Sequence, residues 1–336
     1  MSPFVSQFHF VTGKGGVGKT CVSAALALSL CKKNQGPVLY IEVQGNGMGL
    51  KILGLNQQPR YEIHGLGVHP EAWGMQLTPR PAFQEYMGHV LALGMEKSLL
   101  GQATHQMREK VCETVVSNKI VSAFIDVCPG LEPSVILGKI HYELTQGKDP
   151  DRKRRWAYVV VDAPATGHSL MIFKSTLALT GIFGSGLIFK QASRIQSDIK
   201  NPEIFVPWIV STCEELPLQE AREITKGLHD LNLPAPRLLL NRVPATKTVP
   251  TEKFPDLREP SKHISFSDLD AEWAKALGAW QEEEIDQIAI ARDFLKNNSY
   301  TNLHWLPELT TTSGDFDLNQ ASELLDTSQI KGSPSP

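Results

Sequence analysis

Near its start the chain carries the stretch Gly13-Lys14-Gly15-Gly16-Val17-Gly18-Lys19-Thr20. The apolar run at residues 8–11 predicts a short buried strand before it, and the small and apolar residues 21–30 predict a helix after it. A loop spaced Gly-x4-Gly-Lys-Thr between a strand and a helix is typical of a phosphate-binding P-loop. Its glycines let backbone amides close around phosphate oxygens, and the helix N-terminus adds partial positive charge. We therefore expect this loop to bind the phosphates of a nucleotide.

The polar residues of the loop have separate expected roles. Lys19 is expected to reach the β- and γ-phosphates, and the Thr20 hydroxyl is expected to ligate Mg²⁺. The full set of expected nucleotide contacts in this region is Gly13, Lys14, Gly15, Gly16, Val17, Gly18, Lys19, Thr20 and Cys21.

Composition sets outer limits on the function. The chain has 336 residues, of which 41% are hydrophobic and 21% charged, with a net charge of −3, as in ordinary globular proteins. So small a charge leaves no electrostatic footprint for nucleic acid, and no nucleic-acid partner is expected.

Membrane, targeting and cysteine signals are also weak. The most apolar stretch, residues 175–189, is shorter than the roughly 20 apolar residues of a membrane span, so we expect no transmembrane segment. The first strand begins almost at Met1, so we expect no targeting peptide. Five scattered cysteines without a Cys-x-x-Cys pair indicate neither a disulfide framework nor a zinc site, which favours a cytoplasmic location.

A second motif follows the clearest strand of the chain. Residues 156–162 are continuously apolar and β-branched up to their last residue, which predicts a central parallel strand. The motif that begins there reads Asp162-Ala163-Pro164-Ala165-Thr166-Gly167-His168-Ser169-Leu170. Asp162 is in the Walker B position, where a carboxylate holds the Mg²⁺ shell together with Thr20. Gly167 is expected to let a switch II loop swing toward the γ-phosphate.

This second motif closely resembles Asp-Thr-Ala-Pro-Thr-Gly-His-Thr-Leu of the ArsA family. That family contains the arsenite-pump ATPase and the GET-pathway ATPase that targets tail-anchored membrane proteins. Lys14 marks the deviant P-loop of the wider SIMIBI class. Further resemblance extends from the first strand almost to residue 325, in segments 78–86, 129–132, 211–220, 241–242 and 306–309.

The resemblance implies a fold, cofactors and partners. The fold class is α/β: a doubly wound, parallel-sheet P-loop NTPase with an α-helical insertion. The implied cofactors are ATP and Mg²⁺. Lys14 would contact nucleotide across a dimer interface, Asn241 would read the adenine, and Pro307 would lie near the base.

Domain organisation follows from the same pattern. We expect one ATPase domain over residues 1–325, with a helical subdomain from about 81–123 and 170–199, and a disordered tail at 326–336. No internal repeat is present, so the chain holds one copy of the ATPase unit.

Local patterns around the sheet add finer expectations. Segments 66–69 and 74–77 are predicted to pair as strands. Pro79 is predicted to be the first residue of a helix. The glycine-rich residues 43–49 are predicted to form a flexible loop in the position of switch I.

The switch I loop departs from the family pattern. The family reads Asp-Pro-Ala-His-x-Leu, and its Asp positions or activates the attacking water. Here Glu42 ends the strand, and Gln44 occupies roughly the Asp position. A glutamine can orient water but cannot accept a proton, so hydrolysis is expected to be slow or to depend on a partner subunit. The catalytic candidates are Lys14, Lys19, Gln44 and Asp162, and the sequence leaves open whether Glu42 or Gln44 replaces the aspartate.

Cysteine positions also depart from the family. Cys21 stands where the family usually has Thr or Ser, so one hydroxyl to the α-phosphate is lost. The zinc-binding Cys-x-x-Cys of the eukaryotic targeting factor is absent, and the arsenite-binding cysteine triad of the pump is not recognisable. The chain thus resembles a prokaryotic paralogue without either specialised cysteine site.

Two functions fit these residues. The first is a Mg²⁺-dependent ATPase acting as a nucleotide-driven dimeric switch, as a homodimer or heterodimer, for an apolar client or a membrane-protein partner. The second is an ATP-binding regulatory subunit with little or no hydrolysis, paired with an active paralogue. A ParA/MinD-type positioning ATPase fits less well, because the Thr-Gly-His switch II and the absence of a basic patch or terminal amphipathic helix argue against it.

Overall fold

The computed structural model describes residues 6–86, 131–145, 156–182, 184–243, 303–307, 309 and 316–325, together with residues 287, 290, 291 and 294. Most of the predicted helical segment 81–123 and the predicted tail 326–336 lie outside the described residues. Among the described residues, no helix is both long and apolar enough to cross a membrane.

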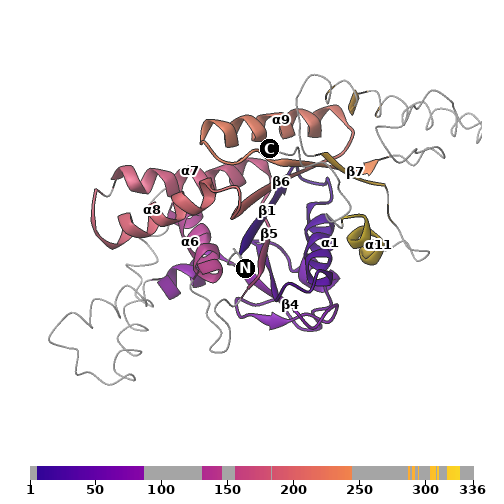
Figure 1. The fold of residues 1–336 in the computed structure, drawn as a ribbon, viewed down its shortest axis with the longest axis horizontal. Helices are drawn as coiled ribbons and strands as arrows, with labels where there is room; N and C mark the ends of the chain where they lie inside the picture. Colours follow the sequence, from indigo (N-terminus) through magenta and orange to yellow (C-terminus); the bar gives the residue numbers. More distant parts are fainter. Residues whose placement is uncertain are drawn as a thin grey trace, which may run out of the picture.

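A single eight-stranded sheet organises the molecule (Figure 1). Its strand order is β3-β4-β2-β5-β1-β6-β7-β8, and every pairing is parallel except that of β3 with β4. The strands are β1 (Gln7–Gly13), β2 (Val38–Val43), β3 (His64–Gly65), β4 (Ala72–Leu77), β5 (Tyr158–Asp162), β6 (Phe205–Ser211), β7 (Arg237–Val243) and β8 (Leu303–Pro307). The predicted α/β fold with a parallel sheet is confirmed.

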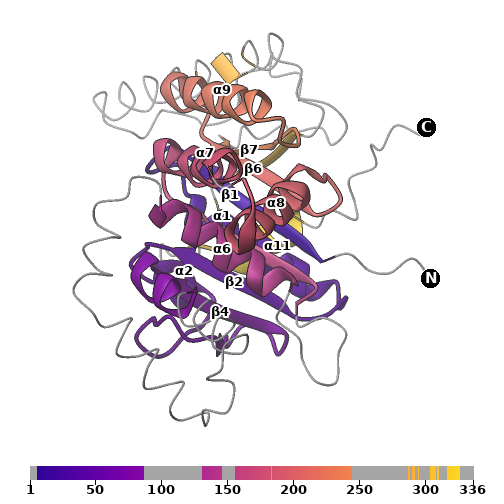
Figure 2. The ribbon, with the colours of Figure 1, turned by 90° about the vertical axis from the view of Figure 1, so that its left-hand side faces the viewer.

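Helices cover both faces of this sheet, as Figures 1 and 2 show. The described helices are α1 (Lys19–Lys32), α2 (Met48–Ile52), α6 (Leu131–Thr145), α7 (Thr166–Ile182), α8 (Gly186–Lys200), α9 (Glu215–Asp230) and α11 (Leu318–Leu324). One hydrophobic layer packs α6, α7, α8 and α9 against the sheet, and the other packs α1, α2 and α11. The sheet is therefore doubly wound.

Burial on both faces explains the unbroken apolar runs of the central strands. Phe10 of β1 packs against Phe173 of α7 and Phe205 of β6 on one face. On the other face α1 is buried along nearly its whole length between the sheet and α11. This double cover is why the α1 sequence is small and apolar all round rather than amphipathic.

Several local predictions need correction. The antiparallel partner of β4 is β3, at His64–Gly65, and residues 66–69 form no strand. Residues 43–49 are not a free loop throughout, because α2 begins at Met48. The short helix α11 was not predicted. By contrast, the helix starting at Pro79 is confirmed, and the predicted helical stretch 170–199 consists of the two helices α7 and α8.

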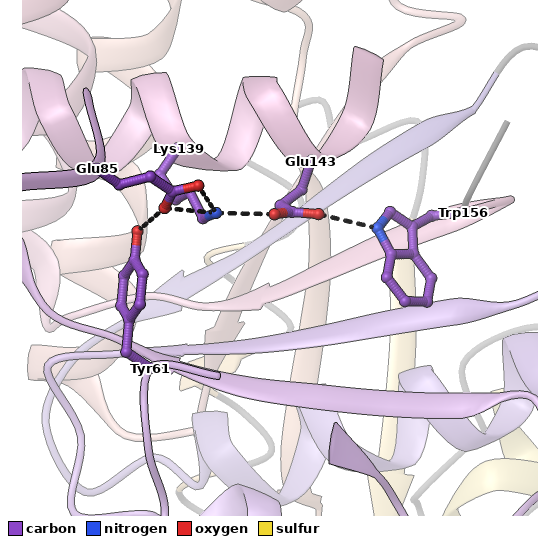
Figure 3. A network of polar contacts seen from close by, with 5 residues as sticks. All are labelled: Tyr61, Glu85, Lys139, Glu143 and Trp156. Carbon is purple, nitrogen blue, oxygen red and sulfur yellow. Dashed lines mark hydrogen bonds and ion pairs between the residues drawn. The ribbon is translucent and has the colours of Figure 1, made fainter. Parts of the chain in front are cut away.

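A partly buried polar network ties the segment around Glu85 and helix α6 to the approach to β5 (Figure 3). Lys139 of α6 lies 2.8 Å from carboxylate oxygens of both Glu85 and Glu143. Tyr61 donates to Glu85, and the Trp156 indole donates to Glu143 at 3.2 Å. The residues around Glu85, helix α6 and the approach to β5 are thus joined by polar groups that satisfy one another.

Candidate phosphate and metal site

The glycine loop connects the end of β1 to the start of α1, at the carboxyl edge of the sheet. Gly13 has a φ of 148°, and a Cβ there would overlap the Val210 carbonyl of β6. Gly18 has a φ of 87°, and a Cβ there would overlap the Asn241 amide. Both positions therefore require glycine, because the loop turns tightly against β6 and β7.

The start of α1 leaves backbone donors facing the loop. Gly18 is the N-cap residue and supplies no side chain to accept from the first-turn amides. Lys19 folds back over the loop, and its ammonium donates to the Lys14 carbonyl at 2.8 Å. Burial lowers the pKa of Lys19, while the nearby charges of Asp162 and Glu220 oppose that shift. Amides, a helix N-terminus and a lysine surround one point, which is the arrangement that phosphate recognition needs.

A hydroxyl and a carboxylate meet beside this cradle. Thr20 donates to Oδ2 of Asp162 at 2.8 Å. The other carboxylate oxygen, Oδ1, is buried and has no hydrogen-bond partner among the described residues. Burial raises the pKa of Asp162 to about 6; the Thr20 hydrogen bond opposes the shift, and the Glu42 charge adds to it. A buried carboxylate oxygen without a donor, next to a threonine hydroxyl, fits a hard divalent cation such as Mg²⁺.

Glu42 is the cross-strand neighbour of Asp162, yet its carboxylate is engaged elsewhere. Oε1 accepts from the Gly47 amide at 2.6 Å, and Oε2 accepts from the amides of Gly49 and Leu50 at 3.0 and 3.4 Å. Glu42 is buried and caps the first turn of α2. Both of its oxygens therefore hold the protein's own backbone.

Gln44 differs from Glu42 in being exposed. Its φ is 53°, in the left-handed region, and its backbone N–H donates to the Leu77 carbonyl of β4 at 3.0 Å. Gln76 of β4 also donates to the Gly45 carbonyl. The loop that we expected to be flexible is thus held by β4 on one side and by Glu42 on the other, with the Gln44 side chain free to face solvent.

Lys14 and Asn241 each contact a neighbouring element. The Lys14 ammonium lies 3.4 Å from Oε1 of Glu220 in α9. Asn241 is buried at the end of β7, and its amide nitrogen donates to the Val17 carbonyl at 2.9 Å. Asn241 therefore braces the back of the phosphate loop, a contact that the sequence did not indicate.

The remaining predicted site residues lie at different distances from the cradle. Cys21 is half-buried in the first turn of α1, where burial raises the pKa of its thiol. Gly167 lies in the first turn of α7 without a positive φ, so the loop expected at this position is helical. Pro307 ends β8, where its backbone pairs with Val243 of β7.

Two residues near the Asp162 carboxylate had no sequence signal. Tyr40 lies in β2 and Ser23 in α1, and both are buried. In the sequence each is one more member of a strand or helix packed on both sides. In the folded protein the Tyr40 hydroxyl reaches Asp162 from β2, the strand beside β5, and the Ser23 hydroxyl reaches the Tyr40 hydroxyl from α1.

A lysine, a threonine and a strand-end aspartate converge at the carboxyl edge of a parallel sheet, beside a loop that joins a strand to a helix. This arrangement defines a P-loop NTPase fold. Comparison with known proteins narrows this class. The family described as Anion-transporting ATPase matches residues 6–42, which span β1, the P-loop, α1 and nearly all of β2.

Curated relatives point the same way. The chain is 26% identical over 242 residues to the ATPase BagA of Mycobacterium tuberculosis, covering 71% of this chain and 66% of the relative's length. It is 23% identical over 347 residues to an ATPase ASNA1 homolog of Entamoeba dispar, covering 93% of this chain and 94% of that relative. These matches make the chain similar to ATPases of the ArsA/GET family.

Proposed function

We propose that the protein binds ATP with Mg²⁺ and hydrolyses it as a nucleotide-driven dimeric switch. The observation that carries this proposal is the paired Thr20 and Asp162, with Oδ1 of Asp162 buried and without a donor beside the Lys19 cradle. Family-level ATPase identity supports the same reading.

Each residue of the site has a proposed task. The backbone amides of the loop and Lys19 would hold the phosphates, and Lys14 would reach a nucleotide across the dimer. Thr20 and Asp162 would hold Mg²⁺, which when bound supplies positive charge to the phosphoryl oxygens. Gln44 would orient the water that attacks the γ-phosphorus, giving ADP and phosphate. Because Gln44 cannot take a proton and Glu42 is engaged in capping α2, turnover by the isolated protein is expected to be slow.

The engagement of Glu42 by the backbone of α2 favours a second candidate function, an ATP-binding regulatory subunit paired with an active paralogue. With Glu42 engaged and only a glutamine on the loop, the site holds no described carboxylate beyond Asp162 that is free to activate water. In this alternative the nucleotide would drive assembly without turnover.

A single-turnover assay with radiolabelled ATP separates the two candidates. The switch requires Mg²⁺-dependent phosphate release that is lost in Lys19→Ala. Tight ATP binding without release, followed by release on adding a paralogue, would support the regulatory subunit. Absence of nucleotide binding by the purified protein would refute both.

The wider organisation is proposed on similar grounds. We place one ATPase unit over residues 1–325, with a helical subdomain near 81–123 and 170–199 that would receive an apolar client or a membrane-protein partner. Ile182, at the end of α7, is exposed and supports an apolar contact at this point. The described cysteines Cys21, Cys31 and Cys213 are free thiols, which suits the reducing cytoplasm that we propose as the location.

A further inference from the structure

Tyr40 brings a hydroxyl to the metal carboxylate from an unexpected direction. It lies in β2, and its Cα pairs with Val160 of the neighbouring strand β5. The side chain is 1% exposed and packs in the hydrophobic layer beneath α1. Its hydroxyl nonetheless donates to Oδ2 of Asp162 at 3.4 Å.

Two further groups surround the same hydroxyl. Ser23 Oγ of α1 lies 3.1 Å away, and Ser23 Oγ in turn donates to the Thr20 carbonyl at 3.0 Å. On the side of α2, a Cβ at Gly49 would overlap the Tyr40 hydroxyl, so the helix after the switch I loop rests directly on it. Strand β2, helix α1 and helix α2 therefore all meet at this oxygen.

The two carboxylate oxygens of Asp162 differ in their hydrogen-bond partners. A carboxylate oxygen has about two acceptor positions, and Thr20 and Tyr40 both donate to Oδ2. Oδ1 accepts from no described residue although it is buried. The two donors hold the plane of the carboxylate, because rotating it away from this orientation would lengthen both hydrogen bonds.

We propose that Tyr40 is a positioning residue for the metal carboxylate: together with Thr20 it holds Oδ2 of Asp162 and so directs Oδ1 toward the divalent cation. The inference rests on the proposed function, since it assigns Tyr40 to the Mg²⁺ site of that function. A phenylalanine would fill the same volume in the core, so packing alone does not call for the hydroxyl. The hydroxyl matters through Asp162.

Tyr40→Phe tests this role, because it removes the hydroxyl and keeps the ring. Tyr158→Phe is the matched control: Tyr158 lies in β5 within the same hydrophobic layer, and its hydroxyl donates to Gln35 rather than to Asp162. Nucleotide affinity is measured for wild type and both variants by calorimetry, once with Mg²⁺ and once with EDTA. The ratio of the two affinities isolates the metal contribution.

We expect Tyr40→Phe to reduce the Mg²⁺-dependent gain in ATP affinity about 5-fold, as for one lost hydrogen bond, with the EDTA affinity unchanged. Tyr158→Phe should leave both affinities at the wild-type value. In an Asp162→Asn background, adding Tyr40→Phe should cause no further change in the Mg²⁺ ratio, because the carboxylate it positions is gone.

Other results overturn the inference. If Tyr40→Phe keeps the wild-type ratio of ATP affinity with Mg²⁺ to ATP affinity with EDTA, Tyr40 is not a positioning residue, while the proposed function stands. Equal losses of affinity with Mg²⁺ and with EDTA would assign Tyr40 to the fold alone. Absence of a Mg²⁺ gain in the wild-type protein would overturn the proposed function, and this inference with it.

Discussion

Lys14 of the phosphate loop and Glu220 of α9 form an ion pair within one chain, with 3.4 Å between the ammonium nitrogen and Oε1. Their side chains are 31% and 33% exposed, so the pair is partly solvated. In the proposed dimer Lys14 leaves this partner for the phosphates of a second nucleotide. The ion pair therefore opposes closure of the dimer.

Glu220→Gln should favour the nucleotide-bound dimer. Removing the acceptor frees Lys14 in each subunit. A partly exposed pair contributes about 1 kcal/mol at most, so two pairs per homodimer should lower the dimer dissociation constant by up to about 30-fold. Sedimentation velocity with a saturating non-hydrolysable ATP analogue measures it. Glu223→Gln, an exposed position on the same helix, is the control for loss of charge. A tighter dimer in both variants, or in neither, would argue against a role of the Lys14–Glu220 ion pair in opposing dimer closure.

Gln44→Asp should accelerate hydrolysis. The residue sits at φ 53°, a conformation that Asp tolerates better than most residues, so the exchange adds a carboxylate without disturbing the loop. General-base catalysis contributes about 100-fold or more when well placed, and we expect at least about a 10-fold faster single turnover. Gln44→Asn controls for the shorter side chain, and an equal rate in both variants would remove Gln44 from the water-positioning role.

Glu42→Gln should act on stability more than on chemistry. The carboxylate accepts three backbone amides at the start of α2, and charge-assisted bonds of this kind contribute about 1.5–3 kcal/mol each. We expect the variant to unfold at lower denaturant concentration while its single-turnover rate, measured where it is folded, stays within about threefold of wild type. Loss of turnover by a factor of hundreds, as expected for a missing general base, would instead make Glu42 the catalytic carboxylate.

Lys139→Met should destabilise the packing of α6 against the sheet. The substitution leaves the buried Glu143 carboxylate without its cation, and breaking a buried pair in this way costs about 3–5 kcal/mol. Lys139→Met combined with Glu143→Gln removes the buried charge, keeps an acceptor for the Trp156 indole and should recover part of that loss. Urea unfolding followed by tryptophan fluorescence reports both, and a double variant weaker than the single one would contradict the assignment.

Acid should destabilise the protein through two buried histidines. Burial and the charge of Arg237 lower the pKa of His9 to about 3 and that of His304 to about 4. As the pH falls below about 6.5, the two histidines take up protons in the unfolded chain while they stay neutral in the folded protein. The free energy of unfolding therefore decreases below about pH 6.5, and these histidines do not affect it above that pH. Each histidine contributes about 2 kcal/mol of this loss by pH 5.

A shallower pH profile in His9→Gln tests this origin. Glutamine keeps an acceptor for the Trp208 indole, which donates to Nδ1 of His9 at 3.0 Å. The variant should take up about one proton fewer on unfolding between pH 6.5 and 4. His229→Gln, at an exposed position, should leave the profile unchanged. Identical slopes in wild type and His9→Gln would show that other groups control acid unfolding.

The P-loop and the Walker B strand could be predicted because their signals are local. The spacing from Gly13 to Thr20 and the apolar run ending at Asp162 each encode a short element whose backbone conformation follows from neighbouring residues. Their meeting was predictable too, because carboxyl ends of parallel strands share one edge of the sheet. The structure places Thr20 and Asp162 in direct contact.

Other features depend on contacts between distant segments. Glu42 could have been the catalytic carboxylate by position in the sequence, and only the folding of α2 onto it shows that its oxygens cap a helix. The helix α11 has too short and mixed a pattern to be recognised, and it forms where the sheet and α1 present an apolar surface. Gly167 suggested a loop, but the register of α7 incorporates it into the helix.

By itself, the amino-acid sequence determined the nucleotide-binding loop and the parallel α/β sheet, because glycine spacing and apolar periodicity act over a few residues. The tertiary structure decided the state of each charged side chain at the site. Lys14 is held by Glu220, Glu42 by the amides of α2, and Asp162 by hydroxyls from α1 and β2. Hydrogen bonds and ion pairs require atoms within about 3 to 4 Å, a distance that only the folded chain sets between residues far apart in sequence.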